Sequence, residues 1–162
     1  MILDLSFIDK AATKKTPKTT RYQKPESLKE LERLHFEQKK VRYPNIKESL
    51  LVKTSFKDDT SNELTKSIIA WIRLNGGSAS RINTTGIYDV KLGKYRRSGS
   101  RKGMSDIVAI MDGKHISIEI KIKNDKMRPD QLKVKDEIER AGGVFITVSS
   151  FDNFLEQIKK YT

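Results

Sequence analysis

Apolar residues recur at helical spacing in two stretches of the first half of the chain. The first predicted helix covers residues 26–41 and ends before Pro44. Its apolar face comprises Leu28, Leu31 and Leu34. The second is expected to begin at Thr60 or Ser61, which are favourable N-caps, and to end at Gly76. Its apolar face comprises Leu64, Ile68, Trp71 and Ile72.

Alternating or continuous apolar positions predict strands in the second half. Strands are expected at residues 78–84, 86–90, 105–111, 115–122 and 144–148, and helices at 129–141 and 151–161. We expect the first two strands to form a hairpin, and a polar loop to follow them over residues 91–102. Asp112–Gly113 predicts a tight turn between the next two strands. The order αβββαβα predicts an α/β fold with a mixed β-sheet flanked by helices.

The N-terminal part differs in composition from the rest. The first 25 residues are rich in threonine and lysine and hold few apolar residues after Ile8, which predicts a mobile basic arm. We therefore expect an N-terminal extension with one helix over residues 1–58 and one domain over residues 59–162. The apolar face of the first helix needs a partner surface. Three uses of this extension stay open: binding DNA, self-association and docking on another protein.

The net charge of +12, with a pI of about 9.8, favours a polyanionic partner, most simply nucleic acid. A basic protein that contacts only other proteins or acidic lipid is the alternative. The absence of cysteine excludes disulfides, zinc–thiolate sites and cysteine nucleophiles. No apolar stretch approaches the roughly 20 residues that cross a bilayer. The opening run is too short, and too acidic at Asp4 and Asp9, for a signal peptide, so we expect a cytoplasmic protein without a membrane partner.

Two acidic residues face each other across the hairpin that turns at residues 112–113. The four isoleucines of HISIEIKI share one face, which places Glu119 and Lys121 on the other face. Pairing the strands about the turn places Asp106 opposite Glu119. Facing carboxylates repel unless a divalent cation lies between them, and Mg²⁺ prefers such oxygen ligands. The alternative is an ordinary solvated strand face on which Glu119 and Lys121 form a surface salt bridge.

These residues also match a family pattern. Gly103-Met104-Ser105-Asp106, followed by Glu119-Ile120-Lys121, resembles the signature of the PD-(D/E)XK nuclease superfamily. The likeness is greatest to its VRR-NUC group, which is common in phages and bacteria. The resemblance covers about residues 60–160 and implies a restriction-endonuclease-like core and Mg²⁺ or Mn²⁺ as the cofactor. The superfamily's proline before the first motif acid is Ser105 here, at a position that varies widely among relatives.

The resemblance implies a role for each site residue. Asp106 and Glu119, with the backbone carbonyl of Ile120, would bind the metal. Lys121 would orient or activate water and stabilise the charge that develops on the phosphate. Glu63, which matches the acid of the family's first helix, would bind metal-bound water or a second cation.

Three polar residues have plainer alternatives. Gln131 matches the family's helix glutamine and would position Lys121 or a phosphate, but it also fits a solvent-facing helix position. Glu63 also fits a favourable charge in a first helical turn. His35 and His115 are isolated in the sequence, and we interpret both as structural or surface residues.

Basic residues next to the motif predict substrate contacts. The segment 91–102, KLGKYRRSGSRK, carries six basic residues and no acid, so we expect it to grip DNA phosphates, with an aromatic ring available for stacking. A solvated hairpin tip is the alternative. The predicted contacts are Lys91, Lys94, Tyr95, Arg96, Arg97, Arg101, Lys102, Lys123 and Arg81. No base-reading motif is visible, so we expect recognition of DNA shape, such as a branch, flap or nick.

The leading hypothesis is a Mg²⁺- or Mn²⁺-dependent, structure-selective endodeoxyribonuclease for replication, recombination or repair, consistent with a phage-encoded protein. Two alternatives stay open: a non-cleaving DNA-binding or assembly protein that keeps the nuclease fold, and an RNA-processing enzyme. Nuclease domains resembling this one often act as dimers, so we expect a homo-oligomer, with a protein partner for the N-terminal helix as a further option.

Overall fold

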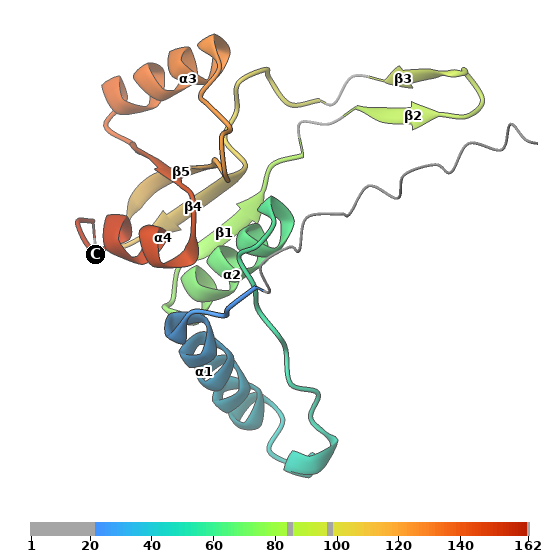
Figure 1. The fold of residues 1–162 in the computed structure, drawn as a ribbon, viewed down its shortest axis with the longest axis vertical. Coiled ribbons are helices and arrows are strands. Elements are labelled where there is room, and N and C mark those ends of the chain that lie inside the picture. Colours follow the sequence, from blue (N-terminus) through green and yellow to red (C-terminus); the bar gives the residue numbers. More distant parts are fainter. Residues whose placement is uncertain (1–21, 84–85, 97–98, 162) are drawn as a thin grey trace, which may run out of the picture.

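The structure is a computed structural model that describes residues 22–83, 86–96 and 99–161. Most of the predicted basic arm and the predicted DNA contact Arg97 lie outside these residues. The elements, shown in Figure 1, are α1 (Glu26–Arg42), a 3-10 helix η1 (Glu48–Leu50), α2 (Ser61–Leu74), β1 (Ser78–Arg81), β2 (Ile87–Asp89), β3 (Lys94–Arg96), β4 (Ile107–Met111), β5 (Lys114–Ile120), α3 (Pro129–Arg140), β6 (Val144–Val148) and α4 (Phe151–Ile158).

Four strands form a mixed sheet in the order β1-β4-β5-β6. The first three pair antiparallel, and β6 runs parallel to β5 after the crossover through α3. Ile107 pairs with Ile118, so the predicted register of the β4–β5 hairpin is confirmed. Its turn has positive φ at both Asp112 and Gly113, 49° and 74°, as a two-residue type I′ turn requires. The chain is therefore a mixed α/β protein with a helix-flanked sheet.

The prediction for the strands after α2 is wrong in one respect. β1 pairs with β4, with Ala79 opposite Ala109, and not with residues 86–90. β2 instead pairs with β3, which lies within the segment expected to be a loop, and these two strands form a separate hairpin. The physical reason is burial: Ala79 is 2 % exposed beside the apolar strand β4, whereas Tyr88 and Tyr95 of the hairpin stay exposed.

The sheet is covered on both faces. Helices α2 and α4 pack on one face, with α1 behind them, and α3 packs beside β6 on the other, as Figure 1 shows. The central strand β5 is consequently buried on both faces from Ile116 to Ile120. The alternative of a solvated face for Glu119 and Lys121 is therefore wrong, because these side chains are 2 % and 7 % exposed.

Helix α1 belongs to the same core as the rest of the chain. Leu28 and Leu31 are fully buried against α2 and α4, so the partner surface that the helix needs lies within this chain, while Leu34 is exposed. Asp58 strengthens this contact, since one of its oxygens accepts from the Tyr22 hydroxyl at 2.6 Å and the other from the Phe151 backbone N–H at 3.1 Å. The expected boundary between residues 58 and 59 thus falls inside one packed unit.

None of the helices in the described ranges combines the length and the apolar character that a bilayer crossing needs.

Candidate active site

The C-terminal end of β5 carries the site. Because β5 is a central strand and α3 begins over its C-terminal end, Glu119 and Lys121 are buried there, whereas Lys114 and His115 at its start are exposed. Lys121 continues the strand beyond its last assigned residue, because its backbone N–H donates to the Val148 carbonyl at 2.8 Å. The backbone positions of Glu119 and Lys121 are consequently fixed by their pairing with β6.

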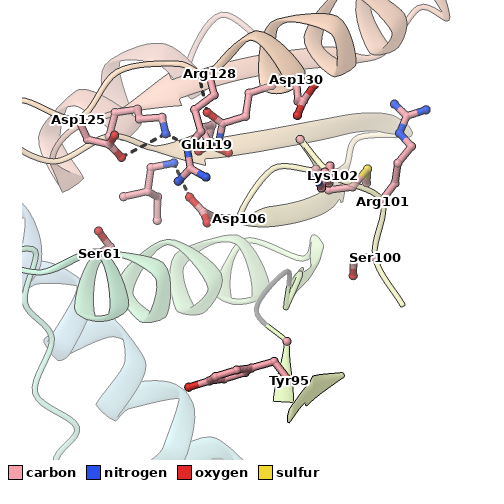
Figure 2. Close-up of a pocket in the computed structure, with 16 residues that line it drawn as sticks. Ser61, Tyr95, Ser100, Arg101, Lys102, Asp106, Glu119, Asp125, Arg128 and Asp130 are labelled. Carbon is pink, nitrogen blue, oxygen red and sulfur yellow. Dashed lines mark hydrogen bonds and ion pairs between the residues drawn. The ribbon is translucent and has the colours of Figure 1, made fainter. Parts of the chain in front are cut away.

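Asp106 reaches the same point from the neighbouring strand. It immediately precedes β4, and its Oδ2 accepts a hydrogen bond from the backbone N–H of Ile120 at 2.9 Å. Its own carbonyl accepts from the Ile82 N–H at 2.8 Å, which ties this position to the chain beyond β1. Figure 2 shows the Asp106 carboxylate directed at the backbone of β5 below Glu119. The structure thus places the carboxylates of Asp106 and Glu119 close together, as the strand register predicted.

The two oxygens of Glu119 have different surroundings. Oε1 accepts from Lys121 Nζ at 2.9 Å and from Gln131 Nε2 at 2.5 Å. Oε2 is buried and has no hydrogen-bond partner among the described residues. Burial raises the pKa of Glu119, and the charge of Asp106 adds to this, against the opposing effect of Lys121 and Gln131. One carboxylate oxygen therefore keeps its full acceptor capacity, without a partner among the described residues, in a site that also holds a second carboxylate.

Lys121 is held as an ammonium group. Its Nζ lies 2.9 Å from Glu119 and 3.2 Å from Asp125 Oδ2. Burial alone would lower the pKa of Lys121, but the contacts with these two carboxylates outweigh it and raise the pKa. Asp125 was not predicted as a site residue. The only signal in the sequence was its position four residues after Lys121. That spacing brings two side chains together on a helix, but it predicts no contact in a turn.

Gln131 of α3 holds the Glu119 carboxylate in place. It is the third residue of α3, 8 % exposed, and its Oε1 accepts from the Arg128 backbone N–H at 2.9 Å while its amide donates to Glu119. The alternative of a solvent-facing glutamine is therefore wrong. The expected contact with Lys121 is replaced by one with Glu119, because the helix start lies directly over that carboxylate.

A glycine allows the segment before β4 to approach α3 closely. Gly103 has φ +83°, and a Cβ there would lie 2.3 Å from the carbonyl oxygen of Asp130. Only glycine fits both the backbone conformation and this contact. The Gly-x-x-Asp spacing thus holds Asp106 and the Gln131 end of α3 in one arrangement.

These groups line a cleft of about 900 Å³. Figure 2 shows Asp106, Glu119, Asp125 and Arg128 gathered at one end and Tyr95 at the other. Of the predicted DNA contacts, Tyr95, Arg101 and Lys102 line this cleft, as does Ile120. Arg101 also pairs with Glu137 at 2.6 Å. The cleft therefore joins an acidic end to a basic side.

The other predicted contacts lie outside the lining. Lys91 and Lys94 are exposed on the β2–β3 hairpin, Arg81 is exposed at the end of β1, and Lys123 is exposed in the turn after β5. Arg96 ends β3, and only its backbone is described.

Glu63 is not brought into the site as expected. It lies in the first turn of α2, where Thr60 caps its N–H and Lys66 binds its carboxylate at 2.6 Å. The same helix contributes Ser61 to the cleft lining.

The two histidines lie away from this site. His35 packs edge-on against Phe56 at 5.3 Å between ring centroids, and burial lowers its pKa. His115 contacts Ser117 at 3.1 Å on β5.

The donor set fits a hard divalent cation. In the part of the chain that the structure describes, no three His, Cys, Asp or Glu side chains are grouped so as to hold a metal. Mg²⁺ is nevertheless commonly bound through one or two carboxylates, with water completing its shell. Asp106 and Glu119, whose Oε2 has no hydrogen-bond partner among the described residues, supply that number.

Comparison with models of known protein families and with curated protein sequences gives no match to this chain.

Proposed function

We propose that the protein is a Mg²⁺- or Mn²⁺-dependent endodeoxyribonuclease and that Asp106, Glu119 and Lys121 form its active site. The observation that carries the proposal is Glu119, a cleft-lining buried carboxylate with one oxygen bound by Lys121 and Gln131 and the other without a hydrogen-bond partner among the described residues. Leaving a buried polar atom unsatisfied costs about 1–3 kcal/mol. A site that tolerates this cost beside a second carboxylate is suited to a bound cation.

The protein's residues divide the work. Asp106 and Glu119, with the Ile120 carbonyl, would hold the cation, which when bound polarises a phosphoryl oxygen and provides a nucleophilic water. Gln131 and the backbone keep Glu119 in place. Lys121 presents an ammonium group at the same point, where it can donate to water or to a non-bridging phosphate oxygen. Arg128 and Lys102 line the cleft where further phosphates of the strand would lie.

The fold that we propose is the restriction-endonuclease-like core. The main-sheet elements follow the order α2, β1, β4, β5, α3, β6, α4, which is the αβββαβα order of the superfamily that the sequence resembles. Asp106, Glu119, Lys121 and Gln131 line one cleft, which supports this proposal, whereas Glu63 lies outside that lining. A DNA substrate follows from the net charge of +12 and from the basic side of the cleft.

The test is a cleavage panel. Flap, nicked, branched, single-stranded and plain duplex DNA, with one matched RNA, are incubated with Mg²⁺, Mn²⁺ or EDTA. We expect metal-dependent cleavage of DNA, lost in Asp106→Asn and Lys121→Met and retained in Asp136→Asn, an exposed acid on α3 outside the cleft. Full activity in the first two variants refutes the assignment. Metal-independent binding without product favours a non-cleaving DNA-binding protein, and preferential cleavage of RNA favours an RNA-processing enzyme.

A further inference from the structure

The β2–β3 hairpin presents apolar side chains that no part of the core covers. It projects from the body of the molecule, as Figure 1 shows, and its residue Tyr95 lines the cleft. At its tip Val90 is 84 % exposed and Leu92 is 57 % exposed. Neither residue belongs to the hydrophobic core or packs against it. What sets these two side chains apart from the other exposed apolar residues is that they lie together at the end of a projecting element, where a contact surface is accessible.

The tip is held in a defined shape. Oδ1 of Asp89 accepts hydrogen bonds from the backbone N–H groups of Lys91 and Leu92, at 3.0 and 3.1 Å. Gly93 closes the turn with φ +60°. In the stem, Tyr88 and Tyr95 pack edge-on with 5.1 Å between their ring centroids. The hairpin can therefore present Val90 and Leu92 without a large ordering cost.

The charges around the tip indicate what it meets. Lys91 lies between the two apolar residues and Lys94 follows them, and the stem residue Tyr95 lines the cleft together with Arg101 and Lys102. The hairpin thus continues the basic side of the cleft away from the acidic end. Duplex DNA carries phosphates on its outside and stacked bases on its inside. Basic residues complement the phosphates, and an apolar tip complements the bases.

We propose that the β2–β3 hairpin is a wedge that inserts Val90 and Leu92 at an interrupted base step of DNA, while Lys91 and Lys94 hold the flanking phosphates. This inference rests on the proposed function and names its substrate class: duplex DNA with a nick, flap or branch. Unstacking a base step is costly in intact duplex, and less so where a base is already unpaired. The wedge therefore favours interrupted DNA without reading its sequence.

The geometry also places the opened step relative to the cleft. Leu92 at the tip precedes Tyr95 at the cleft by three positions. Even a fully extended chain, at about 3.3 Å per residue, would span no more than roughly 10 Å here, and the turn at Gly93 shortens that span. With one base pair per 3.4 Å of duplex, the opened step therefore lies within about three base pairs of the part of the strand that contacts Tyr95.

The experiment compares two double variants of the full chain. Val90→Ser/Leu92→Ser removes the apolar tip, and Val41→Ser/Val52→Ser is the control, because those valines are 81 % and 78 % exposed on and after α1. Thermal unfolding confirms that both variants fold. Fluorescence of 2-aminopurine placed near the branch of a flap substrate reports base opening in EDTA, where no cleavage occurs. Cleavage of flap and plain duplex DNA is then measured with Mg²⁺.

We expect the parent and the control to raise the fluorescence on flap DNA, and the tip variant not to do so. Affinity of the tip variant for flap DNA should fall about tenfold, because the serine side chains bury less apolar surface against the bases, with little change on plain duplex. A tip variant that opens and prefers flap DNA like the parent overturns the wedge and leaves the nuclease proposal intact. A parent that opens flap DNA in EDTA but cleaves nothing with Mg²⁺ or Mn²⁺ overturns the nuclease proposal alone.

Discussion

Replacing Gly103 by alanine tests whether the close approach between the segment before β4 and α3 holds the site together. Two costs add at this position. The first is the backbone conformation, since φ +83° in a residue with a Cβ costs about 1–2 kcal/mol. The second is the contact, because a Cβ 2.3 Å from the Asp130 carbonyl oxygen meets backbone and not a flexible side chain. Such overpacking typically costs about 1–3 kcal/mol.

Gly142→Ala is a matched control for the first cost. Gly142 has the same φ of +83°, but a Cβ there meets nothing within 4 Å. Gly142→Ala should therefore lower the free energy of unfolding by about 1–2 kcal/mol, and Gly103→Ala by about 2–5 kcal/mol, the sum of both costs. Urea denaturation of the parent and both variants, followed by circular dichroism, measures these differences.

Gly103→Ala should also affect activity. Relief of the clash requires α3 to move near Asp130, and the next residue is Gln131, which fixes Glu119. Cleavage should consequently fall in Gly103→Ala even at temperatures where the variant is fully folded, and stay near the parent rate in Gly142→Ala. Equal stability losses in the two variants would refute the close approach as a source of strain. A folded Gly103→Ala with parental cleavage would refute its link to the site.

Three further predictions concern α1, a surface ion pair and the buried pair. Leu28→Ala should lower the free energy of unfolding by about 2–5 kcal/mol, because Leu28 is fully buried in the shared core; a change within experimental error in a denaturation curve would show that α1 is dispensable. Although burial opposes it, Lys24 and the Phe56 N–H lower the pKa of Glu32. Its contribution is therefore present above the unfolded pKa of about 4.3 and lost as the pH falls through the lower folded pKa. Glu32→Gln should accordingly be less stable than the parent near neutral pH and no less stable in acid, and a pH-independent difference would contradict this. In EDTA, Lys121→Met should lower stability by about 3–5 kcal/mol, since it leaves carboxylates unpaired, whereas Glu119→Gln should not lower it, because burial raises the pKa of Glu119; thermal unfolding of both variants decides this.

The β4–β5 hairpin could be predicted from the sequence because its information is local. Alternating isoleucines fix which side chains share a face, and the Asp112–Gly113 turn fixes the register. Together these determine that Asp106 and Glu119 meet at the end of β5. The bounds of α3 and β6 could be predicted from equally local signals, since Pro129 begins the helix and glycines separate it from the strand.

The partners of β1 and α1 could not be predicted in the same way. Ala79 pairs with a strand 30 residues away by position, across the hairpin that lies between them. Leu28 is buried by α2 and α4, which are distant in sequence and carry no signal of that contact. The contact of Gln131 with Glu119 likewise depends on where α3 packs. Local pattern predicts elements, whereas burial against distant elements selects which of them meet.

The most direct measurement of the central claim is Mn²⁺ uptake by the folded protein, followed by isothermal titration calorimetry. The parent should bind Mn²⁺, and Asp106→Asn and Glu119→Gln should each abolish that binding while the fold is kept. Asp125→Asn is the matched control, because Asp125 lines the same cleft but contacts Lys121, and it should retain the uptake. Equal Mn²⁺ binding by the parent, Asp106→Asn and Glu119→Gln would contradict a cation site formed by these carboxylates, and with it the proposed hydrolytic chemistry.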